Sequence, residues 1–301
     1  MNRHSNFHSH CIFCDGRAEP EEFVKSAIEK NFRAYGFSSH SPLPFETYWN
    51  MNKNRMTAYI EEANRLKIKY KGVIELYTGL EIDYLDKTYN ASIPYFRDLP
   101  LDFRISSIHF IPWQLPLLEE NMLCIDGPYK DFEDGLNNHC GGSIRRMTEM
   151  YFDASMQMVE AGCFDIVGHI DKISYNGCRH PDFDINASWF QKPFLELLDF
   201  VAEKGLAVEV NTKYMGRYRQ TFPHIESFKE LYNREIPVMV NSDCHYPELV
   251  NDGREETIEL LLAAGFRSLR ELADGKWQDI DIRHFFRKRK RRSEERSNPE
   301  T

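Results

Sequence analysis

Short apolar segments alternate with longer amphipathic segments along most of the chain. Seven apolar segments, bounded by turn or helix signals, predict β-strands. They lie at residues 6–8, 34–38, 76–82, 103–109, 164–169, 207–211 and 238–242. Six further segments carry apolar residues at helical spacing or end in helix-capping residues, which predicts α-helices. These cover residues 20–30, 55–71, 145–161, 191–204, 225–234 and 254–264.

The alternation of strands and helices predicts the fold class. Strands separated by helices pair in parallel, and seven such units fit a closed or nearly closed β/α barrel. A doubly wound open sheet is the alternative, but no strand is followed by G-x-G-x-x-G or by a P-loop. We expect one domain over residues 1–286. Two long connections, 41–54 and 110–143, are expected to cover a site.

Composition narrows the classes of partner. With 301 residues, of which 42% are hydrophobic, the chain can bury a substantial core. Its net charge of -9 argues against binding nucleic acid through a broad basic surface, whereas a small phosphorylated metabolite stays compatible. A signal peptide or membrane span would need a long apolar run, which we do not find, so we expect a cytoplasmic protein. The basic run that opens residues 287–301 predicts a solvated, disordered tail.

The cysteines predict reduced thiols. There are seven, an odd number at irregular spacing, which does not fit a disulfide framework. Cys11 and Cys14 form a C-x-x-C motif beside two histidines, but no second Cys pair has matching spacing. A zinc site with thiolate ligands is therefore not favoured.

Residues that bind metals recur where the predicted strands end. In a β/α barrel these carboxyl ends converge on one face, so residues far apart in the chain meet there. A single histidine at a strand end is usually structural, but the repetition at six strands favours a metal site. The residues concerned are His8, His10, His40, Glu81, His109, His169, Asp243 and His245. The other histidines are expected to be structural or exposed residues and not metal ligands, and His139 is the one among them that most resembles a ligand. They are His4, His139, His180, His224 and His284.

The spacing of these residues along the chain indicates that neighbouring side chains can bind the same ion. Side chains alternate along a strand, so His8 and His10 point to the same side, and Asp243 and His245 repeat this arrangement. A carboxylate such as Glu81 can bridge two cations. The set can hold two or three divalent ions, and mixed imidazole and carboxylate ligands suit Zn, Mn or Fe.

Six short segments, taken in order, resemble the signature of the PHP (polymerase and histidinol phosphatase) superfamily. They are His8-Ser9-His10, Ser39-His40-Ser41, Gly79-Leu80-Glu81, Ser107-Ile108-His109, Gly168-His169-Ile170-Asp171 and Asn241-Ser242-Asp243-Cys244-His245. The resemblance covers roughly residues 5–265. It implies a distorted (β/α)7 TIM-like barrel with a trinuclear metal site.

The resemblance also implies which residues bind each ion. The first ion would be held by His8, His10, Glu81 and Asp243. The second would be held by Glu81, His109 and His169. The third would be held by Asp15, His40 and His245, with Asp15 standing where the family often has histidine.

Within the superfamily, residues 208–212, 237–245 and 261–266 look like the histidinol-phosphatase branch. The implied reaction is hydrolysis of L-histidinol phosphate to L-histidinol and phosphate, a step of histidine biosynthesis. We expect a metal-bridging hydroxide to attack phosphorus in line. Glu81, Asp243 and His245 are the predicted catalytic residues. The predicted phosphate-binding residues are His40, Lys172, Arg179 and Arg217.

Two other functions stay open at this point. The chain could be a PHP-type phosphatase or phosphodiesterase for another metabolite or nucleotide, with the same metals. A metal-binding accessory protein of DNA processing is the alternative outside the enzymes, and the basic tail is its only support. The sequence does not determine the oligomeric state.

Overall fold

The computed structural model describes residues 4–283, and residues 287–301, the predicted tail, lie outside them. Within the described part, seven parallel strands form one sheet in the order β1-β2-β3-β4-β7-β8-β9. Their bounds are β1 His4–Asn6, β2 Phe32–Phe37, β3 Glu75–Asp83, β4 Phe103–Ser107, β7 Ile166–Val167, β8 Ala207–Asn211 and β9 Val238–Asn241. The predicted strands are confirmed, with ends shifted by a few residues. The first strand ends at Asn6, so His8 and His10 lie just beyond it.

The sheet curls until its two edge strands nearly meet, which distinguishes a barrel from an open sheet. Past the ends of β1 and β9, Ser9 and Cys244 form a parallel bridge. The backbone N–H of His10 donates to the Cys244 carbonyl at 2.9 Å. The N–H of Phe7 donates to Asn241 Oδ1 at 2.8 Å. The predicted nearly closed seven-stranded barrel is confirmed, and the doubly wound alternative is wrong.

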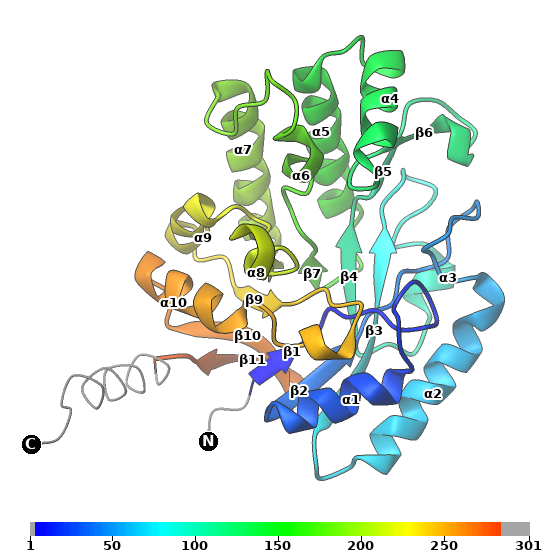
Figure 1. Ribbon diagram of the computed structural model, residues 1–301, viewed down its shortest axis with the longest axis vertical. Coiled ribbons are helices and arrows are strands. Elements are labelled where there is room, and N and C mark those ends of the chain that lie inside the picture. Colours follow the sequence, from blue (N-terminus) through cyan, green and yellow to red (C-terminus); the bar gives the residue numbers. More distant parts are fainter. Residues whose placement is uncertain (1–3, 284–301) are drawn as a thin grey trace, which may run out of the picture.

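Helices surround this barrel, with α1 and α2 on one side and α5 and α7 on another (Figure 1). The helices that correspond to the predicted ones are α1 Pro20–Glu29, α2 Met56–Lys69, α5 Ile144–Ala161, α7 Ser188–Lys204, α9 Phe228–Asn233 and α10 Arg254–Ala264. Their starts and ends follow local chemistry. Ser143 caps α5 by accepting from the Arg146 N–H at 3.2 Å, and Gly205 ends α7 with φ 68°. The predicted helix at 225–234 begins instead as a 3-10 turn, Ile225–Ser227.

The lower part of the barrel is filled by apolar side chains and closed by a hairpin. Phe7, Phe103 and Tyr77 pack there with Leu272 and Trp277 of the antiparallel pair β10 (Ser268–Ala273) and β11 (Lys276–Asp281). The strand prediction missed this hairpin. Apolar side chains thus fill the barrel interior near the amino ends of the strands. The polar residues of the strands lie at the opposite end, where the strands have their carboxyl ends.

The connection 110–143 contains regular structure that was predicted as loop. Strands β5 (Phe110–Pro112) and β6 (Met122–Cys124) pair antiparallel, and helix α4 (Tyr129–His139) follows. Both strands are only three residues long, too short for a recognisable hydrophobic period. The remaining short helices are α3 (Pro94–Arg97), α6 (Ser174–Gly177) and α8 (Met215–Tyr218), with 3-10 turns at Lys53–Arg55, Glu119–Asn121 and Pro247–Leu249. Across residues 4–283, no helix has the length and apolar character needed to cross a membrane.

Candidate metal centre

The carboxyl ends of the barrel strands bring the nine predicted ligands into one cluster. Four overlapping groups each place their ligand atoms within 4.8 Å of one another. The groups are His8, His10 and Asp243; Glu81, His109 and His169; His10, Asp15, His40 and His245; and His40, Asp83 and His109. Residues separated by more than two hundred positions in the chain therefore share one centre.

The first group matches three of the four ligands predicted for the first ion. Asp243 Oδ1 lies 3.0 Å from His10 Nε2 and 3.9 Å from His8 Nε2. The backbone of Asp243 has φ 47°, a left-handed conformation that aspartate adopts more readily than most residues. Such a conformation persists where the surrounding structure holds it, and here it directs the carboxylate toward both imidazoles.

Glu81 joins the first group to the second through its two carboxylate oxygens. Oε2 lies 3.2 Å from His8 Nε2 and 3.6 Å from His10 Nε2. Oε1 lies 2.9 Å from His169 Nε2 and 3.4 Å from His109 Nε2. Oε2 is also 2.9 Å from His40 Nδ1. Because the two oxygens face different imidazoles, Glu81 has the geometry of a ligand shared by two cations.

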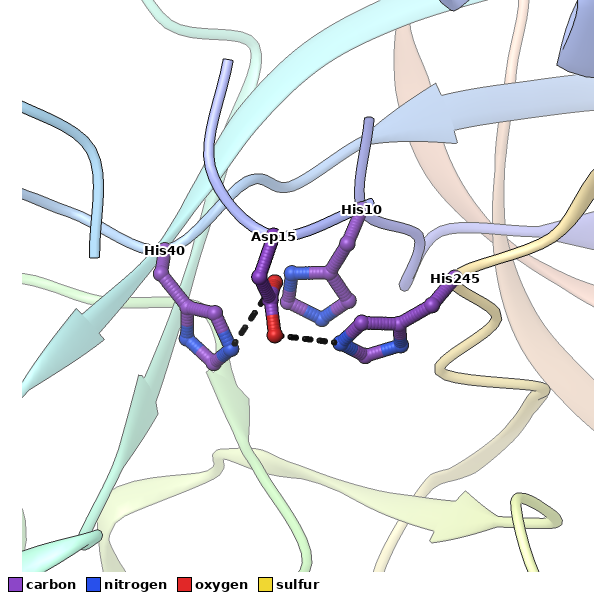
Figure 2. A group of neighbouring side chains, drawn as sticks. All are labelled: His10, Asp15, His40 and His245. Carbon is purple, nitrogen blue, oxygen red and sulfur yellow. Dashed lines mark ion pairs between the residues drawn. The ribbon is translucent and has the colours of Figure 1, made fainter. Parts of the chain in front are cut away.

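The third group surrounds the carboxylate of Asp15, which lies between the rings of His40 and His245 (Figure 2). Asp15 Oδ2 is 3.2 Å from His245 Nε2, and Oδ1 is 3.9 Å from His40 Nε2. The structure adds His10 to the three predicted residues. Gly16 makes this turn possible, because a Cβ at that position would lie 2.2 Å from the His10 carbonyl oxygen.

Two buried carboxylates orient the imidazoles from behind, and the sequence did not identify them. Glu209 Oε1 accepts from His8 Nδ1 at 2.6 Å, and Asp83 Oδ1 accepts from His109 Nδ1 at 2.8 Å. Such a pairing fixes the ring and leaves Nε2 to bind metal. A signal was present: Glu209 interrupts the apolar strand β8, and Asp83 follows Glu81 by two residues and shares its face of β3.

The charges at the centre compensate one another. Burial alone would raise the pKa of Glu81, but His8 and His109 outweigh it and hold that pKa well below its ordinary value. Burial lowers the pKa of His10, and the neighbouring His40 and His245 lower it further. These directions favour a neutral His10 and an ionised Glu81, the forms in which both bind a metal. Against the lowering effect of burial, the nearby carboxylates raise the pKa of His8 well above its ordinary value and that of His109 to about 10, so a metal ion would displace a proton from each.

Several buried polar atoms at the centre lack a hydrogen bond. Within residues 4–283 these include His8 Nε2, His10 Nε2, Glu81 Oε2 and Asp15 Oδ1. They lie close to one another, yet none makes a hydrogen bond of good geometry. Unsatisfied buried polar groups are costly, and a divalent cation would satisfy several of them at once. The residues present thus fit a centre of more than one metal ion.

A cavity of about 460 Å³ lies against this centre. Asp15, His40, His109, Asp243 and His245 form part of its lining. The two long connections supply other walls, which include residues 47–49 and parts of 119–139, among them His139. The expectation that these connections cover a site is met by this lining.

Trp49 of the first connection packs directly on the centre. Its ring centroid is 4.5 Å from that of His40 and 5.3 Å from that of His109. It also stacks on Phe110 at 5.7 Å, where the second connection begins. The indole therefore links both connections to two candidate ligands.

Three of the predicted phosphate-binding residues, all of them cations, lie outside the cavity lining. Lys172 is 1% exposed, and its Nζ is 3.3 Å from Asp126 Oδ2. Arg179 lies over the Tyr129 ring at 3.9 Å and Arg217 over the Tyr218 ring at 5.1 Å, both on the exposed surface. None of the three lines the cavity, whereas His40 does. The cation that does line it is Lys213, which was not predicted.

Comparison with known proteins agrees with this architecture. The family model of the PHP domain matches residues 4–213, which is more than half of the chain. The chain belongs to the PHP domain family.

Relatives of this PHP protein include two enzymes of known name. The histidinol-phosphatase of Bacillus subtilis is 27% identical over 257 residues, covering 79% of this chain and 92% of its own. That of Lactococcus lactis is 26% identical over 270 residues, covering 88% and 91%. A crystal structure of the Lactococcus lactis histidinol phosphate phosphatase, in complex with zinc, L-histidinol and phosphate, matches with a TM-score of 0.70. At 18% identity it covers 92% of this chain and 99% of its own, which shows a shared fold.

Glu209→Gln tests the carboxylate behind His8. Glutamine keeps the size, but its amide nitrogen cannot accept a hydrogen bond and Nδ1 loses a charged acceptor. We expect metal affinity and metal-dependent activity to fall by about 10- to 100-fold. Metal titration measures the affinity, and Glu203→Gln on the exposed face of α7 is the matched control. Equal metal affinity in the two variants would contradict a role for Glu209 in orienting His8.

Proposed function

We propose that this PHP protein hydrolyses a small phosphate monoester, L-histidinol phosphate, to L-histidinol and phosphate. The observation that carries the proposal is the buried Glu81 carboxylate, whose two oxygens face different groups of imidazoles beside a cavity. The names of the Bacillus subtilis and Lactococcus lactis relatives support the choice of substrate.

Divalent ions, when bound, would supply an activated water and neutralise charge on the phosphate. His8, His10, Glu81 and Asp243 would hold the first ion, and Glu81, His109 and His169 the second. Asp15, His40 and His245 would hold the third, with His10 beside them. The mixture of imidazole and carboxylate suits Zn, Mn or Fe.

The side chains of the protein position the metal ligands and shield the centre from water. Glu209 and Asp83 hold the rings of His8 and His109, so that both present Nε2 toward Glu81. Trp49 covers His40 and His109 on the side of the first connection. Asp243 and His245, the other two predicted catalytic residues, both line the cavity, where they would act as deprotonated metal ligands and not as proton donors.

The cavity favours a small substrate. Its volume of about 460 Å³ lies within the range of pockets that bind small molecules. Among the described lining residues, carboxylates outnumber cations, which disfavours the backbone of a nucleic acid. The seven cysteines are free thiols, so we propose that the enzyme works in the reducing cytoplasm.

A substrate panel tests the proposal. With metal-loaded protein, kcat/KM for L-histidinol phosphate is expected to exceed that for nucleotide monophosphates and for a phosphodiester by at least about 100-fold. An enzyme prefers one substrate by this factor when its site forms hydrogen bonds with polar groups of that substrate that the competing substrates lack. Equal turnover of a nucleotide monophosphate would contradict L-histidinol phosphate as the substrate but would still support a phosphatase. Faster turnover of the diester would contradict phosphate monoester hydrolysis as the reaction.

A further inference from the structure

We propose that Lys213 binds the phosphoryl oxygens of the substrate, an inference that rests on the proposed phosphatase function. Lys213 follows strand β8 and lines the cavity beside Asp243. Its Nζ is 3.1 Å from Asp243 Oδ1. The cation thus stands at the edge of the candidate metal centre, where the reacting phosphate would lie.

The backbone holds Lys213 firmly in this place. Its own N–H donates to Asn211 Oδ1 at 3.0 Å. The preceding Thr212 donates its N–H to the Asn241 carbonyl at 2.8 Å and its hydroxyl to the Asp252 carbonyl at 2.6 Å. These bonds join the end of β8 to the segments around β9, so the backbone of Lys213 is fixed relative to that of Asp243.

Lys213 also retains donors for a substrate. Asp243 Oδ1 is the carboxylate oxygen that His10 Nε2 approaches at 3.0 Å, and Asn211 Nδ2 occupies Oδ2 at 3.1 Å. An ammonium group has three N–H donors, and Asp243 takes one of them. The side chain of Lys213 is 29% exposed, so its remaining donors are accessible from the cavity.

Lys213 is also set apart by the charge of the other lining residues. Among the described residues, Lys213 is the one Lys or Arg that lines the cavity, while carboxylates line it at several places, including Asp15, Asp126 and Asp243. A phosphate dianion in this cavity would form a strong charge-assisted hydrogen bond with such a cation. Lys172 cannot supply it directly, because it is buried against Asp126.

A purely structural role for Lys213 makes a different prediction. If the lysine only holds Asp243 in place, its loss should weaken metal binding and leave phosphate affinity of the metal-loaded protein unchanged. If it binds phosphate, the reverse should hold. Metal content and phosphate affinity, measured on the same sample, separate the two roles.

The experiment compares Lys213→Met with Lys213→Arg in the full-length, metal-loaded protein. Binding of inorganic phosphate is measured by isothermal titration calorimetry, metal content by mass spectrometry, and KM and kcat with L-histidinol phosphate. For Lys213→Met we expect phosphate affinity to fall and KM to rise by about 10- to 100-fold, as for loss of one charge-assisted hydrogen bond. Metal content should stay at the wild-type value, and Lys213→Arg should recover part of the phosphate affinity.

Lys192→Met is the matched control, because Lys192 lies on α7 with 78% of its side chain exposed. The assignment is overturned if Lys213→Met binds phosphate within twofold of wild type, or if Arg217→Met weakens phosphate binding more than Lys213→Met does. A wild-type protein that binds phosphate through Lys213 but does not hydrolyse L-histidinol phosphate would refute the proposed substrate and support this assignment.

Discussion

Replacement of Glu81 by alanine is expected to abolish phosphatase activity and to remove more than one ion's share of bound metal. The carboxylate is fully buried, and its two oxygens face separate groups of imidazoles. Loss of a bridging ligand should therefore weaken two sites together. Stabilisation of transition-state charge by metal is worth several kcal/mol, so we expect kcat/KM to fall by at least about 1000-fold.

Metal content by mass spectrometry and kcat/KM on the same preparation check this result. His139→Ala is the matched control, because His139 lines the cavity but belongs to none of the four ligand groups within residues 4–283. That variant should keep its full metal content and lose less activity than Glu81→Ala. Loss of no more than a single ion from a folded Glu81→Ala protein would contradict the bridge.

Removal of the metals is the second change with a large expected effect. A strong chelator should reduce activity to background, and added Zn, Mn or Fe should restore it. The folded protein should also become less stable, because ions that bind only the native state stabilise it. With free metal at about 1000 times the dissociation constant, the stabilisation is about 4 kcal/mol. For a chain of this size we expect the melting temperature to fall on the order of 5–10 °C.

The stability change has a structural cause that a variant can test. Without metal, buried atoms such as His8 Nε2 and Asp15 Oδ1 lack partners among the described residues, so the native state keeps that cost. Thermal unfolding with and without chelator measures the shift. Glu81→Ala should show a smaller shift than wild type, since it holds less metal. An equal shift in both proteins would place the stabilising ion outside this centre.

Elements with a strong local pattern were predictable. Strand β3 was expected at 76–82 and extends over Glu75–Asp83, and its burial on both faces is typical of a parallel strand. Strand β7 was expected at 164–169 but spans only Ile166–Val167. After Val167 the chain leaves the sheet at Gly168, where a Cβ would lie 2.2 Å from Ser107 Oγ. Packing between strands determined that boundary.

The turn of the β10–β11 hairpin has a recognisable sequence. Asp274 and Gly275 both have positive φ, as a two-residue hairpin turn of type I′ requires, and Asp-Gly is a strong sequence signal for it. The hairpin lies where it does because Leu272 and Trp277 cover the apolar lower end of the barrel. That contact is between distant segments and has no local counterpart.

The sequence by itself determined the alternation of strands and helices and the residue types that recur at strand ends, because both depend on periodicity and local spacing. It thereby singled out His8, Glu81, His169 and Asp243 as members of one centre. Only the tertiary structure decided which groups support them. Glu209 meets His8 across 201 residues, and Lys213 rather than Arg217 reaches the cavity, because closure of the barrel and the paths of its loops place these side chains.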